Sequence, residues 1–260
     1  MRSTEPLDVL PIPVLLIIFA LLSLAAYEIG FQIGALRKRR DPQPGEGHIG
    51  LVVGSILGLM AFLLGITVGM AADRFDNRRA LVLAETNAIG TAYLRAGYLS
   101  EPASSESQAL LREYVPLRIA SSNLEELSAN LERSEEIQTE LWAIAEDVAR
   151  TEGSDVVALY IESVNEVIDL HTSRFVAGIY ARVPATILWL LIAGVILSLS
   201  LVGYNAGLDR KRNPLVAVVL ILALGAVMWL VIDLDRPRDG LLQTSQQPLI
   251  DLRERLDASP

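Results

Sequence analysis

The chain has 260 residues, of which 52% are hydrophobic and only 20% are charged. A chain this apolar is not an ordinary water-soluble globule, and its lack of cysteine excludes disulfides, thiolate catalysis and thiolate metal sites. The net charge of -9 argues against nucleic acid as a partner, and two histidines are too few for a histidine-rich metal centre.

Four segments are long and apolar enough to cross a bilayer, whose hydrocarbon core of roughly 30 Å needs about 20 helical residues. The predicted transmembrane helices are residues 9–36, 49–72, 183–208 and 213–232. Because open segments cross lipid only as helices, we predict an all-α integral membrane protein. We expect the first segment to be a retained helix and not a cleaved signal peptide, because its apolar run is long and a basic block follows it.

Short connections join the first helix to the second and the third to the fourth, so the four helices are predicted to form two hairpins. Between the hairpins, residues 73–182 carry 10 Arg and 19 Asp or Glu, a balance of -9. This extramembrane domain must lie on the same side of the membrane as both termini, including a polar C-terminal tail at residues 233–260. Basic residues flank the helices in nearly equal numbers on the two sides, so the positive-inside rule does not fix the orientation.

The extramembrane domain shows a helical pattern. Apolar residues recur mostly at three- and four-residue steps from Leu110 to Val148, and again from Val157 to Phe175. That spacing places an apolar stripe along one face of an amphipathic helix. Breaks are expected at residues 100–102, at Pro116 and at residues 152–154. The domain is therefore predicted to be an acidic helical bundle.

Sequence motifs of enzymes are missing from the chain. It contains no G-x-S-x-G, no P-loop, no H-E-x-x-H and no G-x-G-x-x-G that opens a βαβ unit. We therefore expect no catalytic residues, no metal site, no cofactor and no enzymatic activity.

The second predicted helix carries a stripe of glycines that recur largely at four-residue steps: Gly50, Gly54, Gly58, Gly65 and Gly69. Small residues at such spacing let helix backbones approach closely in lipid, which favours a role in helix packing. A pore-lining or flexible face is the alternative. Gly30 and Gly34 add a shorter pair in the first helix, near Glu28.

A charged segment without a decisive helix breaker follows the second span, so this helix is predicted to continue out of the membrane. The helix that returns to the third span must run antiparallel to it through the same layer outside the membrane. We expect the two helices to interact through a charged collar: Arg74, Arg78, Arg79, Glu85, Asn165, Asp169 and Arg174. Structural ion pairing is the favoured role of the collar, and a ring of charge around a pore is the alternative.

Several motifs of the chain occur together in one known family. They are Arg74-Phe75 with Arg78-Arg79, residues 85–90, residues 165–174, Gly203-Tyr204 with Gly207, and a tail motif of Asp233, Asp235, Arg236, Pro237 and Gly240. In these motifs and in its four-span layout the chain resembles the bacterial bestrophin-like domain family, membrane proteins distantly similar to bestrophin channels. It departs from those channels at Phe75, where they have tryptophan, and at residues 236–240, where they have an Asn-Pro-Phe-Gly run.

The resemblance implies a homo-oligomeric ion channel or channel-like protein of the bacterial inner membrane, a pentamer whose second helix lines the axis. It also implies that the helical domain forms a vestibule and that this domain and both termini are cytoplasmic. The expected partners are the lipid bilayer, further copies of the chain and inorganic ions. Selectivity stays open, because an acidic domain concentrates cations. The alternative function is a non-conducting membrane sensor or scaffold whose helical domain binds a ligand or a partner helix.

Overall fold

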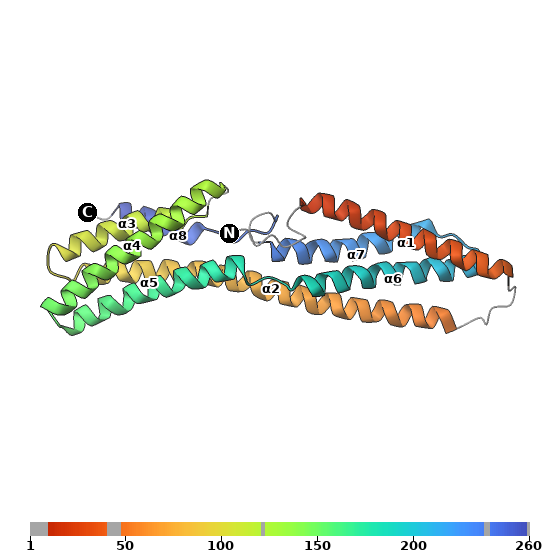
Figure 1. Cartoon of the computed structure of the whole chain (residues 1–260), viewed down its shortest axis with the longest axis horizontal. Coiled ribbons are helices and arrows are strands. Elements are labelled where there is room, and N and C mark those ends of the chain that lie inside the picture. The colour runs from red at the N-terminus through yellow and green to blue at the C-terminus, as the bar shows by residue number, and fades with distance from the viewer. Residues whose placement is uncertain (1–9, 41–47, 121–122, 237–239, 259–260) are drawn as a thin grey trace. The chain divides into compact units, whose positions relative to one another are not determined.

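A computed structural model describes residues 10–40, 48–120, 123–236 and 240–258, except for the side chains of His48 and Leu124. Within these ranges the chain forms eight α-helices (Figure 1): α1 Ile12–Arg40, α2 His48–Ala96, α3 Ala103–Leu117, α4 Leu124–Thr151, α5 Asp155–Ile179, α6 Ala185–Asp209, α7 Pro214–Asp235 and α8 Gln247–Asp257. Helices α1, α2, α6 and α7 are long and apolar enough to cross a membrane. The predictions of an all-α fold and of four apolar helices of this length are confirmed.

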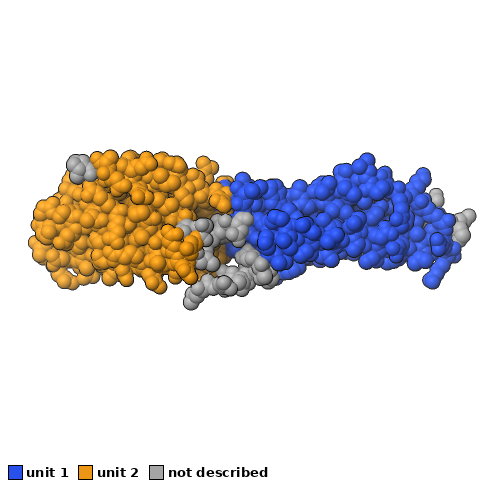
Figure 2. Space-filling view, turned by 90° about the horizontal axis from the view of Figure 1, so that it is seen from above, with its two compact units in different colours: residues 1–75, 182–242 blue, residues 76–181, 243–260 orange. Residues whose placement is uncertain are grey.

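The chain divides into two compact units, which Figure 2 colours separately. Unit 1 comprises residues 1–75 and 182–242 and contains the apolar helices, whereas unit 2 comprises residues 76–181 and 243–260. The division lies close to the ends of the predicted extramembrane domain, residues 73–182, but unit 2 also takes in the last part of the tail. Helix α2 has 49 residues and belongs to both units, so the predicted continuation of the second helix beyond its apolar segment is confirmed.

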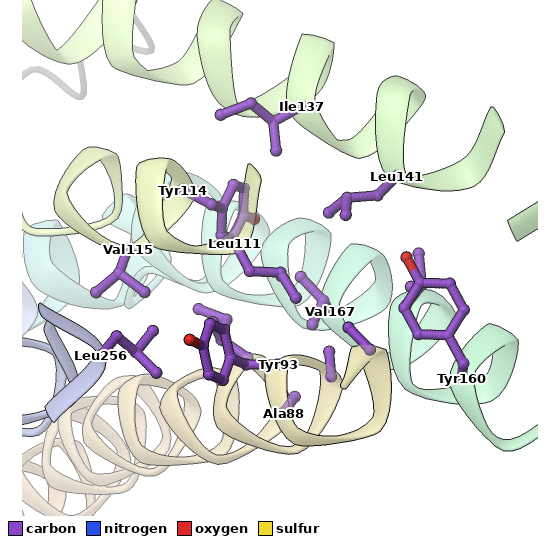
Figure 3. Packing of buried hydrophobic residues seen from close by; sticks show 14 of the residues in the cluster. Ala88, Tyr93, Leu111, Tyr114, Val115, Ile137, Leu141, Tyr160, Val167 and Leu256 are labelled. Carbon is purple, nitrogen blue, oxygen red and sulfur yellow. The ribbon is translucent and has the colours of Figure 1, made fainter. Parts of the chain in front are cut away.

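Unit 2 is a bundle of the second half of α2 with α3, α4, α5 and α8. All five helices contribute to one apolar core, and Figure 3 shows part of it: Ala88, Tyr93, Leu111, Tyr114, Val115, Ile137, Leu141, Tyr160, Val167 and Leu256. Helix α8 lies in the predicted polar tail, where Leu249, Leu252 and Leu256 are buried. Its three- and four-residue spacing of leucines makes a short amphipathic helix that covers the bundle.

The predicted helix break at Pro116 is confirmed, because α3 ends there although the apolar periodicity continues into α4. Pro116 lies in the last turn of α3, and residues 118–123 separate the two helices. The new helix begins with a side-chain cap, because the Asn123 carboxamide oxygen accepts the backbone N–H of Glu125 at 2.9 Å. Glu125 and Glu126 then place negative charge in the first turn, where the helix dipole favours it.

In unit 1 the most extensive helix contact joins α1 to α6. A Cβ atom added to Gly30 or Gly34 would overlap the backbone carbonyl of Ser200 or Tyr204, and one added to Gly203 would overlap the carbonyl of Tyr27. A step of four residues along α1, from Gly30 to Gly34, moves the contact four residues forward along α6, from Ser200 to Tyr204. The two helices therefore run parallel. Glycine is required here because the two backbones touch directly.

The prediction that the four spans form two hairpins is not confirmed by this packing. Helix α1 packs mainly on α6, from which it is distant in sequence, and it also contacts α7. Helix α2 reaches α6 through the long side chain of Met60, which lies against Gly194. The backbones of α1 and α6 therefore hold the centre of unit 1, whereas α2 contacts it through side chains.

Candidate functional site

A buried charge cluster joins four elements of unit 2. The Glu85 side chain of α2 is completely buried, and its two carboxylate oxygens each accept from a different arginine. Arg118, just after α3, donates its Nε to Oε1 at 2.7 Å, and Arg174 of α5 donates its Nη1 to Oε2 at 2.6 Å. Arg174 also donates its Nη2 to the side-chain oxygen of Gln246, the residue that precedes α8, at 2.7 Å.

The stoichiometry of the buried charge cluster is its main physical feature. Two guanidinium groups face one carboxylate, so the cluster carries surplus positive charge in a largely dry environment. Arg118 keeps only 6% of its side chain exposed and Arg174 only 15%. A buried charge is tolerated only when it is paired and hydrogen-bonded. Glu85 therefore compensates two arginines at once and links α2, the end of α3, α5 and the start of α8.

A second buried network lies next to the cluster. The Gln138 amide donates to the Tyr114 hydroxyl at 2.9 Å, and this hydroxyl lies 3.1 Å from Nδ1 of His171. The Arg118 guanidinium carbon lies 5.8 Å from the centroid of the Tyr114 ring. Burial raises the pKa of Tyr114 to about 12. Burial, together with the nearby charge of Arg118, lowers the pKa of His171 to about 4, so this imidazole is neutral at pH 7.

The structure brings together two members of the predicted charged collar, Glu85 and Arg174. Asn165 and Asp169 lie on the exposed face of α5, where the Asn165 amide donates to the Asp169 carboxylate at 3.0 Å. Arg74 donates to the backbone oxygen of Met70 on its own helix at 3.3 Å. Of the remaining members, Arg78 is buried and Arg79 is exposed.

The acidic residues of the predicted tail motif are buried at the end of α7 in unit 1. The Asp233 carboxylate accepts the backbone N–H groups of Leu241 and Leu242, at 2.7 and 3.0 Å. Gly240 is required nearby, because a Cβ atom there would lie 2.9 Å from the carbonyl oxygen of Asp233. This carboxylate therefore holds the chain that leaves α7. Pro237 of the motif lies outside the described residues.

The other two charged members of the tail motif hold separate segments of unit 1. Asp235 accepts the Nε of Arg182 at 2.8 Å and the backbone N–H of Val183 at 2.7 Å. Arg236 is buried and donates to the backbone oxygen of Leu10 at 2.8 Å. These contacts fasten the start of α6 and the start of α1 to the end of α7. The tail motif therefore has a structural role in this unit.

The predicted glycine stripe of α2 faces open space within the chain. A Cβ atom added to any of its members would meet no atom within 4 Å: Gly50, Gly54, Gly58, Gly65 and Gly69. The packing glycines of this chain are instead those of α1 and α6. The α2 stripe is therefore available to a partner outside the chain, such as lipid, water or another subunit.

Comparison with known proteins decides the family. The sequence profile described as Bestrophin-like domain matches residues 17–249, nearly the whole chain. The chain belongs to the bestrophin-like family. The resemblance found in the sequence is thereby confirmed. No curated protein and no solved structure matches the chain.

Some residues of the buried networks in this bestrophin-like chain carry no signal in the sequence. Arg118 lies in the connection after α3, with no periodic pattern that would relate it to Glu85. Tyr114 belongs to the predicted apolar stripe and Gln138 does not, but neither position indicates that the two side chains form a hydrogen bond. The signals that pointed to this site are two motifs shared with the bestrophin-like family, residues 85–90 and 165–174, and the predicted charged collar, which includes Glu85 and Arg174. Within the described ranges, no group of three or more His, Asp or Glu side chains could hold a metal ion.

The buried neutral His171 predicts a pH-dependent stability for the bestrophin-like chain. Its folded-state pKa of about 4 lies below the ordinary value of 6.5, so on acidification the unfolded chain takes up a proton first. The stabilising contribution is therefore complete above about pH 6.5 and is lost as the pH falls toward 4. We expect the apparent melting temperature to fall by roughly 5 °C between pH 7 and pH 5, and less in His171→Gln. His48→Gln is the control, and an equal fall in both variants would contradict the assignment to His171.

Proposed function

We propose that this protein is a homo-oligomeric, non-enzymatic ion channel of the bacterial inner membrane, with α2 lining the axis of the oligomer. Membership of the bestrophin-like family and four helices of membrane-spanning length and composition support this function. By its resemblance to bestrophins the oligomer is a pentamer. Unit 2, which follows the apolar part of α2, forms the vestibule in this proposal.

The observation that carries the proposal is the open face of α2. In the most apolar window of this helix 17% of residues are buried within the chain, against 28% in each of the other three apolar helices. The glycine stripe lies on α2, with nothing from its own chain near it. A helix that is loosely held in its subunit and carries a face of small residues is suited to close approach around a common axis.

The experiment that tests the proposal combines oligomeric mass with ion flux. The purified full-length chain is measured by native mass spectrometry in detergent and then reconstituted into liposomes, with K⁺ and Cl⁻ fluxes recorded separately. A pentamer that conducts supports the channel, and the ratio of the two fluxes gives its selectivity. A monomer or dimer without flux overturns the channel and supports the alternative of a membrane sensor or scaffold.

The matched variants are leucine substitutions on the α2 stripe. Gly54→Leu and Gly58→Leu introduce a large side chain where the chain itself has open space, so each subunit should still fold. In the oligomer the added side chains separate backbones that the small-residue face lets touch. We expect the population of oligomer and the ion flux to fall at least severalfold in either variant. Variants that assemble and conduct like the parent would show that the stripe faces lipid or open water.

The proposed orientation places unit 2 and both termini in the cytoplasm, as in bestrophins. The counts of basic residues flanking the spans do not decide it, because they are nearly equal on the two sides. A reporter fused after residue 260 tests the orientation directly. Fluorescence of a cytoplasm-dependent protein at that position supports the proposal, and alkaline phosphatase activity at the same position overturns it.

A further inference from the structure

The ends of α1 and α6 bring two basic segments to one end of unit 1. The helices run parallel, and the backbone nitrogen of Leu208 lies 3.1 Å from the position that a Cβ on Gly34 would occupy. Leu208 and Gly34 therefore lie at the same level. Beyond that level α1 ends in Arg37, Lys38, Arg39 and Arg40, and α6 is followed by Arg210, Lys211 and Arg212. We call these seven residues the basic rim.

One residue of the basic rim holds the connection after α6 against α1. Arg212 donates its Nη2 to the Glu28 carboxylate of α1 at 2.9 Å, and its guanidinium carbon lies 4.4 Å from the centroid of the Phe31 ring. The connection between α6 and α7 is therefore held against α1 at Glu28 and Phe31, which precede Arg37 along the helix. Arg210 and Lys211 lie in the same connection, next to Arg212.

Among the residues that the structure describes, the other six residues of the basic rim have no carboxylate partner. In the part of the chain that the structure describes, no ion pair involves Arg37–Arg40, Arg210 or Lys211, and five of these six side chains are exposed. Residues 28–48 and 209–212 together hold seven basic and four acidic residues, a balance of +3 in a chain of net charge -9. This end of unit 1 is therefore a strongly basic surface.

A hollow on α1 connects the basic rim to the apolar surface. It has a volume of about 360 Å³ and is lined by Ile33, Leu36, Arg37 and Arg40. Counted from Ile33, the other three residues lie at i+3, i+4 and i+7, so all four lie on one face of the helix. Along that face two exposed apolar side chains, at 53% and 54%, lead directly to two arginines.

The order of these side chains along α1 matches the chemistry of a phospholipid. Acyl chains favour an apolar helix face, and an arginine beside it can bind a phosphate through two parallel N–H donors. Basic residues at the end of a membrane-spanning helix attract anionic lipids, and basic pockets on transmembrane helices bind their head groups. The negative end of the helix dipole accounts for some basic residues in a last turn, but not for the apolar and basic face that lines the hollow.

We propose that the basic rim and the hollow on α1 form a binding site for one anionic phospholipid. Arg37 and Arg40 hold the phosphate, Ile33 and Leu36 contact an acyl chain, and the remaining rim residues add attraction. The proposal rests on the membrane location given under Proposed function. It does not depend on conduction, on subunit number or on which side of the membrane the rim faces.

The test compares lipid retention by the full-length chain and by two variants of equal charge. The chain is reconstituted into nanodiscs of phosphatidylcholine and phosphatidylglycerol in equal amounts and re-extracted in mild detergent, and retained lipid is identified by native mass spectrometry. Arg37→Gln/Arg40→Gln removes two rim charges and keeps Lys38 and Arg39. The control Arg150→Gln/Arg253→Gln removes two exposed arginines of unit 2, each of which forms an ion pair with an acidic residue four positions away on its own helix.

We expect the parent and the control to retain phosphatidylglycerol in preference to phosphatidylcholine, and the rim variant to lose about tenfold of this preference. Arg37→Lys/Arg40→Lys should retain an intermediate preference, because lysine keeps the charge but not the paired donors. Equal retention of the two lipids by the parent overturns the proposal, as does an equal loss in rim variant and control. Inorganic phosphate is added as competitor, and displacement at millimolar concentration would identify a site for a free anion instead of a lipid.

The outcome separates this proposal from the proposed function. A chain that inserts and retains phosphatidylglycerol but does not conduct overturns the channel alone. A chain that assembles and conducts without lipid preference overturns the lipid site alone.

Discussion

Replacing Glu85 by glutamine is expected to lower the free energy of unfolding of unit 2 by about 3–5 kcal/mol, the range for breaking one side of a buried ion pair. The reason is that Arg118 and Arg174 both depend on this carboxylate, at 2.7 and 2.6 Å. A neutral amide fills the same space but leaves two buried guanidinium groups without a counter-charge. In the full-length chain the apparent melting temperature of unit 2 should fall by roughly 10 °C.

The matched control for Glu85→Gln is Glu162→Gln on α5. Glu162 is 71% exposed and lies 3.6 Å from Arg95, so this ion pair is solvated and should contribute about 0–1 kcal/mol. The melting temperature of the control should therefore stay within about 2 °C of the parent. A double variant, Glu85→Gln with Arg174→Gln, should lower the free energy of unfolding by less than the sum of the two single substitutions. The reason is that it also removes the Arg174 charge, which Glu85→Gln alone leaves unpaired. Additive losses would show that the cluster is not coupled.

The parts of the fold that depend on a single physical constraint were predictable from the sequence. A bilayer demands long apolar helices, and the four helices of this kind were visible as uncharged runs between charged blocks. The continuation of α2 followed from the lack of a helix breaker after residue 72. The apolar spacing continues across the break between α3 and α4, but Pro116 predicted the break next to the last residue of α3, Leu117. The start of α4 has a local pattern of its own, the run Ser121-Ser122-Asn123 followed by Glu125 and Glu126, which is typical of a helix start.

The candidate site depended on contacts that no local pattern encodes. Glu85 and Arg174 could be related because both helices must pass through the same layer outside the membrane. Arg118, in the connection between α3 and α4, donates to the same carboxylate. Gln246, the residue before α8, accepts from Arg174. Their partners are chosen by the tertiary fold of unit 2. The short helix α8 itself was hidden in a segment whose charge suggested a solvated tail.

The glycines also show that sequence spacing alone does not determine which surfaces come into contact. The stripe on α2 and the glycines of α1 and α6 have the same four-residue spacing in the sequence, and that spacing predicts close packing for all of them. In the folded chain a Cβ atom added to Gly30, Gly34, Gly203 or Gly207 would overlap backbone atoms, whereas one added to a glycine of the α2 stripe would meet no atom within 4 Å. Periodicity identifies a face that permits close approach, but it does not identify the surface that approaches. Only the neighbours of each face in the folded unit distinguish the two roles.

Alanine substitutions at the two kinds of glycine are expected to change the stability of the subunit in opposite directions. Gly203→Ala adds a Cβ atom that overlaps the carbonyl oxygen of Tyr27, so α1 and α6 must separate along their whole contact. We expect the free energy of unfolding to fall by about 3 kcal/mol or more, which is the upper end of the range for overpacking a protein interior. Gly54→Ala adds the same atom in open space and replaces a poor helix former, so it should leave the stability of the subunit unchanged or raise it by up to about 1 kcal/mol. The measurement is the detergent melting temperature of monomer isolated by dilution, with Gly30→Ala and Gly58→Ala as a second pair. A parent-like melting temperature for both Gly203→Ala and Gly30→Ala would show that the backbones of α1 and α6 do not touch.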